Sequence, residues 1–256
     1  MSQGSLKDRV AIITGGARGI GKATAIKMVQ EGASVALLDI LAQEVSRAAN
    51  ELKAMGGNAL GILADVSHRD EVDRAVKQTM EHFGRIDILV NNAGIVKPAL
   101  LEDVQDGDWD EVVNVNLKGT FFCTRAVLPT MKIQRYGKII NIGSRASLGK
   151  ELRTVYGATK AALIGVTRTW ALELAQYKIN VNYIGPGPVA TELFKAANPM
   201  ESPRTKAIID GIPLKRVGQP EDVANLVSFL ASDEASFITG QAIFICGGLT
   251  VGLAHY

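Results

Sequence analysis

The feature that most constrains the fold is a regular alternation of two kinds of segment along the 256-residue chain. Short runs rich in valine and isoleucine alternate with longer amphipathic stretches. Nearly continuous apolar runs suit strands that are buried on both faces of a sheet. Strand–helix–strand repetition implies parallel pairing with right-handed crossovers. The sequence therefore predicts an α/β fold in a single domain over residues 1–256, a doubly wound parallel sheet of about seven strands with helices on both faces.

The alternation also places the individual elements. We expect strands at residues 10–14, 34–39, 59–64, 87–90, 137–142, 179–184 and 242–245. We expect helices at 19–31, 41–55, 69–83, 109–131, 155–177 and 220–231. Between Pro186 and Pro220, glycines, prolines and mixed charges surround a helical piece at about 192–210. Because long insertions in compact domains are often lids, we predict a substrate lid at about 188–215.

Charge and hydropathy exclude several classes of protein. The 28 basic residues nearly balance the 26 acidic ones, and no basic block or acidic tail stands out. Nothing therefore indicates a nucleic-acid partner or an anionic membrane surface. The polar start, residues 1–9, lacks the apolar stretch of a secretory signal, and no apolar run reaches the length of a membrane span. We expect a cytoplasmic protein with no membrane partner.

Metal and disulfide chemistry find little support in the sequence. The three histidines lie far apart, no His or Cys pair has metal-ligand spacing, and there is no Gly-x-Ser-x-Gly. We therefore expect no metal site and no serine-hydrolase site. Cys123 and Cys246 both lie in apolar segments, which is typical of buried thiols in a reducing compartment rather than of a disulfide framework.

A glycine-rich segment, residues 14–21, follows the first predicted strand. Its spacing, Gly15-x-x-x-Gly19-x-Gly21, differs from the standard G-x-G-x-x-G dinucleotide fingerprint. Glycines let the backbone turn sharply and approach a phosphate closely, and the helix that follows offers free N–H groups. Between a strand and a helix, a phosphate-binding loop is favoured over a purely structural turn.

Asp39 ends the second predicted strand, 18 positions after Gly21. A carboxylate there can accept hydrogen bonds from a ribose diol and repels a 2′-phosphate, which favours NAD over NADP. The alternative is a solvent-exposed aspartate at a strand end. Arg18 argues the other way, because a guanidinium beside the loop could bind a 2′-phosphate. We favour NAD, since a close pair of like charges is costly.

Tyr156 and Lys160 are four positions apart on a predicted helix and so share a face. A free tyrosine titrates near 10 and is a poor base at neutral pH, but a neighbouring ammonium favours the phenolate. Such a pair alone is a weak signal. Ser144 strengthens it, because this residue lies at the carboxyl end of the fifth predicted strand, where site residues gather in open α/β sheets.

Together these residues resemble the short-chain dehydrogenase/reductase family, whose fold is of the Rossmann type, over nearly the whole chain. The matching segments are 14–21, 65–66, 91–94, 115–117, 144–160 and 186–191. The resemblance implies that 65–66 contact adenine, that 91–94 lie beside adenosine, and that 186–191 frame the nicotinamide. With the arguments above, it predicts cofactor contacts from Gly15, Arg18, Gly19, Ile20, Asp39, Asp65, Val66, Asn92, Ala93, Gly94, Tyr156, Lys160, Pro186, Gly187, Val189 and Thr191.

The same resemblance implies a mechanism. Tyr156 exchanges a proton with the substrate oxygen, which Ser144 holds, while hydride moves between a carbinol carbon and the nicotinamide. Lys160 bonds the ribose, lowers the pKa of Tyr156, and relays protons through a water held at Asn116. The predicted catalytic residues are thus Asn116, Ser144, Tyr156 and Lys160, in general acid–base catalysis with a nicotinamide cofactor.

The chain departs from the family pattern at three places. Gly143 stands where a second serine is frequent, Cys246 stands where aspartate is common, and Ser144 is 12 positions before Tyr156, one fewer than in many members. Ser147 is an alternative hydroxyl, but Ser144 matches the strand end.

The substrate is less constrained than the chemistry. We expect it to contact Ser144, Tyr156, Leu148 and Pro188, near Arg145, Lys150, Glu151 and Arg153. These charges indicate a polar or acidic substrate if they face the site, but we favour the alternative that they face solvent or a subunit interface. The sequence does not choose among aromatic alcohols, cyclic alcohols, sugars and ketoacyl thioesters.

The function favoured is an NAD-dependent oxidoreductase that acts on a secondary alcohol or ketone, a small molecule. One alternative is an NADP-linked 3-ketoacyl reductase. Another, from a different class, is a non-catalytic dinucleotide-binding sensor or scaffold, against which the intact set of predicted catalytic residues argues. Family members are commonly tetramers built through the long helices at 109–131 and 155–177 and through the C-terminal strand, so the resemblance also predicts a homotetramer.

Overall fold

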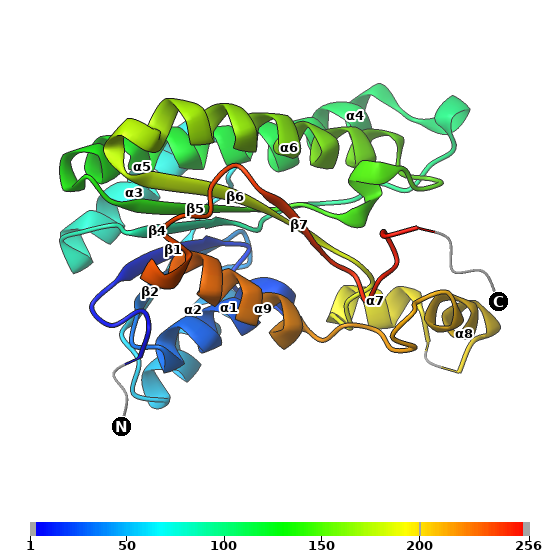
Figure 1. Ribbon diagram of the computed structural model, residues 1–256, viewed down its shortest axis with the longest axis horizontal. Helices are drawn as coiled ribbons and strands as arrows, with labels where there is room; N and C mark the ends of the chain where they lie inside the picture. Colours follow the sequence, from blue (N-terminus) through cyan, green and yellow to red (C-terminus); the bar gives the residue numbers. More distant parts are fainter. Residues whose placement is uncertain (1–3, 200, 253–256) are drawn as a thin grey trace.

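The computed structural model describes residues 4–199 and 201–252, whose strands form one sheet (Figure 1). Its order is β3-β2-β1-β4-β5-β6-β7, and all neighbouring strands pair in parallel. The strands are β1 (Val10–Thr14), β2 (Ser34–Asp39), β3 (Ala59–Leu63), β4 (Ile88–Asn91), β5 (Gly137–Ile142), β6 (Ile179–Pro186) and β7 (Ala242–Ile245). The chain runs outward from β1 in one direction and from β4 in the other, so β1 and β4 flank the switch point of the sheet.

Helices cover both faces of the sheet, as the sequence predicts (Figure 1). One layer holds α1 (Gly19–Gln30), α2 (Ala42–Ala54) and α9 (Pro220–Ala231). The other holds α3 (Arg69–Phe83), α4 (Asp106–Val113), α5 (Gly119–Gln134) and α6 (Thr154–Leu174). Short 3-10 turns lie at Leu101–Asp103, Arg145–Leu148, Ala175–Tyr177 and Asp233–Ala235.

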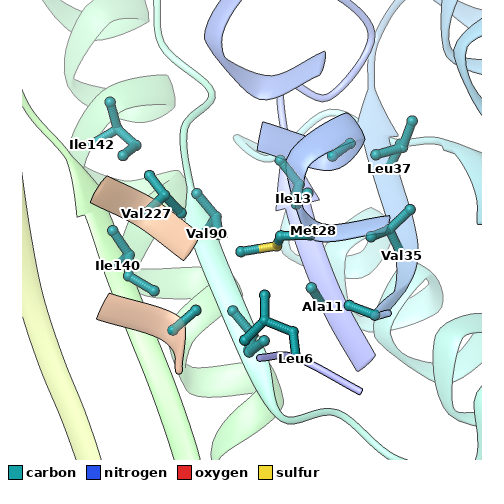
Figure 2. Packing of buried hydrophobic residues seen from close by; sticks show 14 of the residues in the cluster. Leu6, Ala11, Ile13, Met28, Val35, Leu37, Val90, Ile140, Ile142 and Val227 are labelled. Carbon is teal, nitrogen blue, oxygen red and sulfur yellow. The ribbon is translucent and has the colours of Figure 1, made fainter. Parts of the chain in front are cut away.

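A buried apolar cluster fills the space on each side of the sheet. Under α1 and α9, Met28 and Val227 pack with Ile13 of β1 (Figure 2). On the opposite side, Leu89 of β4 and Val127 of α5 belong to the second cluster. The nearly continuous apolar character of the strands follows from this burial on both faces.

The helix predicted at 109–131 is interrupted in the structure. It runs as α4, a π-helical turn at Asn114–Lys118, and α5, with the Gly119 N–H donating to the Asn114 carbonyl. A π-helical turn adds one residue to a helical circuit and is frequent at functional sites. Hydrophobic periodicity does not reveal it, because the helix continues on both sides. The turn contains Asn116, a predicted catalytic residue.

The helical piece predicted at about 192–210 is two helices, α7 (Glu192–Ala197) and α8 (Pro203–Asp210). The prediction of one helix was wrong because it overlooked a second start signal. Ser202 accepts a hydrogen bond from the Thr205 N–H at 3.2 Å, and Pro203 occupies the first turn. Serine before proline is a favoured helix beginning.

Strand β4 begins one residue later than predicted, at Ile88 rather than at Asp87. The buried Asp87 carboxylate accepts the Val10 N–H at 3.0 Å and bonds Arg85. The prediction of two buried free thiols is confirmed at Cys123 and Cys246.

Within residues 4–199 and 201–252, no helix has both the length and the apolar character needed to cross a membrane.

Candidate active site

The glycine-rich loop lies at the carboxyl end of β1 and leads into α1. Gly15 and Gly19 have φ angles of 62° and 53°, which favour glycine. A Cβ at Gly15 would lie 3.0 Å from the Asn92 side chain. A Cβ at Gly19 would lie 3.2 Å from the side chain of Thr191, the residue that caps α7. Arg18, the residue before α1, provides no side-chain cap. The loop therefore has the close backbone and free N–H groups that suit a pyrophosphate.

Thr14 and Asn92 join this loop to the end of β4. The Thr14 hydroxyl accepts the N–H groups of Asn92 and Ala93, both at 3.0 Å. In return, the Asn92 amide donates to the Thr14 carbonyl at 2.9 Å and to the Gly15 carbonyl at 3.0 Å. These four hydrogen bonds span the switch point and fix the glycine loop against the segment that begins at Ala93.

Asp39 lies at the end of β2, beside the glycine loop, as the sequence predicts. Its carboxylate accepts the Ala17 N–H at 3.1 Å and the Leu41 N–H at 3.2 Å. The side chain is half-buried, whereas Arg18 is exposed. The structure thus places a fixed negative charge next to the loop and a solvent-facing cation near it.

The remaining predicted cofactor residues surround this edge of the sheet. Asp65 follows β3 and bonds the Ser67 N–H and hydroxyl, and the buried Val66 side chain packs beside Gly119. Ile20 opens α1 and packs on the core. Gly187 bonds the Ile245 carbonyl at 2.9 Å, where a Cβ would meet Cys246. Pro186 ends β6, and Val189 and Thr191 continue toward α7.

Ser144 and Tyr156 lie at the two ends of the turn between β5 and α6, close enough for Ser144 to affect the pKa of Tyr156. The Ser144 hydroxyl accepts the Ala146 N–H at 3.1 Å. Burial raises the pKa of the Tyr156 phenol, while hydrogen bonding from Ser144 acts in the opposite direction. A protonated phenol next to a hydroxyl is suited to binding and protonating a substrate oxygen. Leu148 and Pro188, the other predicted substrate contacts, are exposed and half-buried respectively.

Lys160 is a buried cation one helical turn beyond Tyr156. Its Nζ donates to the Ile142 carbonyl at 2.8 Å and lies 5.7 Å from the centroid of the Tyr156 ring. Burial lowers the pKa of Lys160 to about 8. A lysine ammonium held among neutral groups is costly for folding and marks a candidate functional site.

Asn116 approaches Lys160 from the π-helical turn. Its amide donates to the Ile95 carbonyl at 3.0 Å and accepts the Ile95 N–H at 2.8 Å, so it holds both backbone groups of that residue. A Cβ at Gly94 would meet Asn116 Oδ1 at 3.2 Å and Lys160 Nζ at 3.3 Å. Glycine at 94 therefore permits the close meeting of three predicted site residues.

Tyr183 is a positioning residue that the sequence analysis missed. Its fully buried hydroxyl donates to the Ser144 carbonyl at 2.9 Å and accepts the Ser144 N–H at 3.0 Å. It also lies 3.1 Å from Ser147 Oγ, whose hydroxyl donates to the Ser144 carbonyl. A Cβ at Gly143 would collide with the Tyr183 ring. The signal was present: a tyrosine inside a buried strand needs a partner for its hydroxyl, and Gly143 leaves room for one.

Comparisons with known proteins show which proteins this chain is similar to. A family model described as enoyl-(acyl carrier protein) reductase matches residues 15–250. The chain is 42% identical to the (2S)-[(R)-hydroxy(phenyl)methyl]succinyl-CoA dehydrogenase subunit BbsD of Thauera aromatica, over 95% of this chain and 97% of that one. It is 42% identical to the 3-oxoacyl-[acyl-carrier-protein] reductase of Thermotoga maritima, over 96% and 99%. The crystal structure of levodione reductase superposes with a TM-score of 0.92 at 35% identity, covering 97% of this chain and all of that one.

Replacing Tyr183 with phenylalanine tests its contacts around Ser144. The variant loses the hydroxyl that serves both backbone groups of Ser144, so we expect the free energy of unfolding to fall by about 1–2 kcal/mol in urea titrations. The control is Tyr177→Phe, whose half-buried ring lies under Lys132 outside the site, with an expected change below about 0.5 kcal/mol. Equal effects of the two variants would contradict this account of Tyr183.

Replacing Lys160 with methionine tests the cost of its charge. The pKa of Lys160 is about 8 in the folded protein, against an ordinary value of 10.5. The charge therefore destabilises the fold below pH 8, and the penalty disappears as pH rises toward 10.5. We expect Lys160→Met to raise the free energy of unfolding at pH 7 by up to about 3 kcal/mol, and less at pH 10. A loss of stability at pH 7, or no dependence on pH relative to an exposed control, Lys53→Met, would refute this.

Proposed function

Because the chain belongs to the short-chain dehydrogenase/reductase family, we propose that this oxidoreductase interconverts the 3-hydroxy and 3-oxo forms of an acyl thioester with NAD(H). The observation that carries the proposal is the grouping of the Ser144 hydroxyl, the half-buried Tyr156 phenol and the buried Lys160 ammonium at the carboxyl edge of the sheet. This grouping supports general acid–base chemistry at a substrate oxygen.

The chain's own residues account for the proton and for the positions of the reactants. The glycine loop and the first turn of α1 would hold the pyrophosphate, and Asp39 the adenosine ribose. When bound, the nicotinamide would accept or supply a hydride. In reduction, the Tyr156 phenol gives its proton to the oxygen that Ser144 orients. In oxidation, the Lys160 ammonium favours the phenolate that takes the proton back.

Asn116 takes part by positioning. Its side chain bonds both backbone groups of Ile95, which keeps the segment after Gly94 in place beside Lys160. A rigid segment after Gly94 would hold the reactants at reacting distance. Such positioning supplies much of the rate enhancement in enzymes. The intact group of Asn116, Ser144, Tyr156 and Lys160 argues against a non-catalytic sensor or scaffold.

The substrate class rests on the relatives. Two of them are named for acyl thioesters, a succinyl-CoA derivative in one case and a 3-oxoacyl group on acyl carrier protein in the other. They favour the 3-ketoacyl alternative over a simple secondary alcohol. The fold does not distinguish the two, since the structurally similar levodione reductase is named for a different ketone.

The cofactor is argued from charge. Asp39 is fixed beside the loop by the Ala17 and Leu41 N–H groups, where it would repel a 2′-phosphate. Arg18 supports the competing NADP(H) candidate, because its exposed guanidinium could reach such a phosphate. The fixed carboxylate is the better-placed of the two charges, so we favour NAD(H).

The lid and the oligomeric state stay predictions. Two short helices, α7 and α8, occupy the segment predicted as a lid, and α7 begins against the glycine loop through Thr191. Large exposed apolar side chains, Trp109 of α4 and Phe121 of α5, lie on helices through which we predict a homotetramer.

A Tyr156→Phe variant tests the acid–base role. With acetoacetyl-CoA and NADH, followed by nicotinamide absorbance, we expect the variant to lose about 10²- to 10⁴-fold in kcat. NADH binding by calorimetry should be retained, since the ring stays in place. Tyr177→Phe serves as the control with normal turnover. Undiminished turnover in Tyr156→Phe would reject the assignment, and no turnover of any thioester by the wild-type protein would reject the substrate class.

An Asp39→Ser variant tests the cofactor. Loss of the carboxylate should weaken NADH binding by about tenfold and strengthen NADPH binding, because the repulsion of the 2′-phosphate disappears. The affinities for NADH and NADPH must change in opposite directions, because a loosened glycine loop alone would weaken the binding of both cofactors. Parallel losses, or tighter NADPH than NADH binding by the wild-type protein, would overturn the preference for NAD(H).

A further inference from the structure

Gly143, directly after β5, is explained by a neighbouring ring rather than by its own backbone. It is not among the glycines that have a positive φ, so its backbone conformation does not favour glycine. A Cβ at this position would collide with the Tyr183 ring and with the Tyr183 hydroxyl oxygen. The ring, which comes from β6, therefore occupies the space that a side chain at 143 would fill.

The Tyr183 ring is held in a defined orientation. It is fully buried, and the Phe244 ring of β7 packs against it with the two centroids 6.0 Å apart and an interplanar angle of 63°. Edge-on pairs of this kind are favourable for aromatic rings. A Cβ at Gly185 would collide with Phe244, so a second glycine makes room for the aromatic pair. The phenol hydroxyl is thereby directed at the backbone of Ser144.

The Tyr183 hydroxyl serves one backbone group of Ser144 that has no second partner. Among residues 4–199 and 201–252, the Tyr183 oxygen is the only acceptor of the Ser144 N–H, at 3.0 Å. The Ser144 carbonyl, in contrast, accepts the Ser147 N–H at 3.1 Å and the Ser147 hydroxyl at 2.8 Å, besides the Tyr183 hydroxyl at 2.9 Å. Loss of the phenol hydroxyl would leave the Ser144 N–H unpaired and its backbone free to turn toward another partner.

The backbone of Ser144 bears on the reaction because its side chain would hold the substrate oxygen. The Ser144 hydroxyl accepts the Ala146 N–H at 3.1 Å, so its position depends on the backbone of the turn. Tyr183 lies on β6, which ends at Pro186 and continues into Gly187, two predicted nicotinamide contacts. One side chain thus connects the residue for the substrate oxygen with the strand that carries part of the predicted cofactor site. Hydride transfer needs both reactants at a short distance, so this connection affects the rate.

We propose that Tyr183 positions Ser144 for the reaction, and that Gly143 and Tyr183 form one unit in which a hydroxyl from β6 takes the place of a side chain at 143. The inference rests on the proposed function, because it concerns the residue that would hold the substrate oxygen. Tyr183 is fully buried and acts on the reaction through Ser144, so the rate is the property to measure. The substitution Gly143→Ser would direct a hydroxyl toward the point that the Tyr183 oxygen occupies, which makes the two arrangements exchangeable.

Replacing Tyr183 with phenylalanine keeps the ring and its packing but removes the hydroxyl. With acetoacetyl-CoA and NADH, we expect kcat to fall by about 10- to 100-fold, because a displaced Ser144 would hold the substrate oxygen away from its reacting position. The dissociation constant of NADH, measured by calorimetry, should change by less than about twofold. Tyr177→Phe, outside the site, is the control with normal kcat. An undiminished kcat in folded Tyr183→Phe would overturn the proposal.

A paired exchange tests the unit of Gly143 and Tyr183. In the wild-type background, Gly143→Ser should lower kcat, because the new side chain collides with the Tyr183 ring. In a Tyr183→Ala background, the same substitution should raise kcat by about five- to tenfold, because the space is open and the new hydroxyl can accept the Ser144 N–H. Gly143→Ala in the Tyr183→Ala background is the matched control, which adds no hydroxyl and should not raise kcat. A fall in kcat on Gly143→Ser in both backgrounds would overturn the unit, and Tyr183→Phe decides alone if Tyr183→Ala does not fold.

A titration without substrate separates this inference from the proposed function. Ionisation of Tyr156 is followed by tyrosinate absorbance, as the difference between each protein and the same protein with Tyr156→Phe. Burial raises the pKa of Tyr156 and hydrogen bonding from Ser144 lowers it, so loosening Ser144 in Tyr183→Phe should raise that pKa by about 0.5 or more.

The ionisable groups that face Tyr156 are Lys160, Arg153 and Tyr183. The first two keep their charges in Tyr183→Phe, and loss of the Tyr183 phenol by itself would lower the pKa of Tyr156, so a rise identifies the effect of Ser144. A rise without turnover of any thioester supports the positioning and rejects the thioester alone. Thioester turnover with no rise rejects the positioning alone.

Discussion

The hydrogen bonds between Thr14 and Asn92 are the constraint on which the candidate site depends. They join the ends of β1 and β4, the two strands from which the chain runs in opposite directions. Pairing of β1 with β4 brings the two strand ends side by side, and this link extends the connection into the loop after β1 and the segment after β4. With it, the glycine loop, Gly94 and the groups reached through Gly94 occupy one rigid edge, which a hydride transfer over a short distance requires.

At that edge, stability and chemistry make opposite demands. Lys160 has a carbonyl and an aromatic ring for neighbours, and its lowered pKa reflects the unfavourable burial of its charge. Ser144, in contrast, is held by the buried Tyr183 hydroxyl, whose hydrogen bonds to both backbone groups of Ser144 stabilise the fold. The apolar core on both sides of the sheet offsets the cost of the buried Lys160 charge.

How far the sequence predicts this arrangement depends on the range of each interaction. Buried strands have a direct apolar signal, so β1, β2 and β5 have the predicted bounds. The helical spacing of Tyr156 and Lys160 and the strand-end place of Ser144 predicted one candidate site, and the roles of these residues stay predictions. The hydrophobic periodicity does not reveal the π-helical turn at Asn116, because one inserted residue hardly alters a helical pattern. Tyr183 was missed because its partner lies on a neighbouring strand, and the break between α7 and α8 because the cap at Ser202 was not weighed. The cofactor preference stays a prediction, since Asp39 and Arg18 oppose one another.

Net charge illustrates the same limit most clearly. A total of +2 does not say where individual charges lie. The structure fixes the Asp39 carboxylate beside the glycine loop and places the Lys160 ammonium beside the Tyr156 ring. Two charges of opposite sign therefore stand at separate points of one edge of the sheet, and only the tertiary structure places them there.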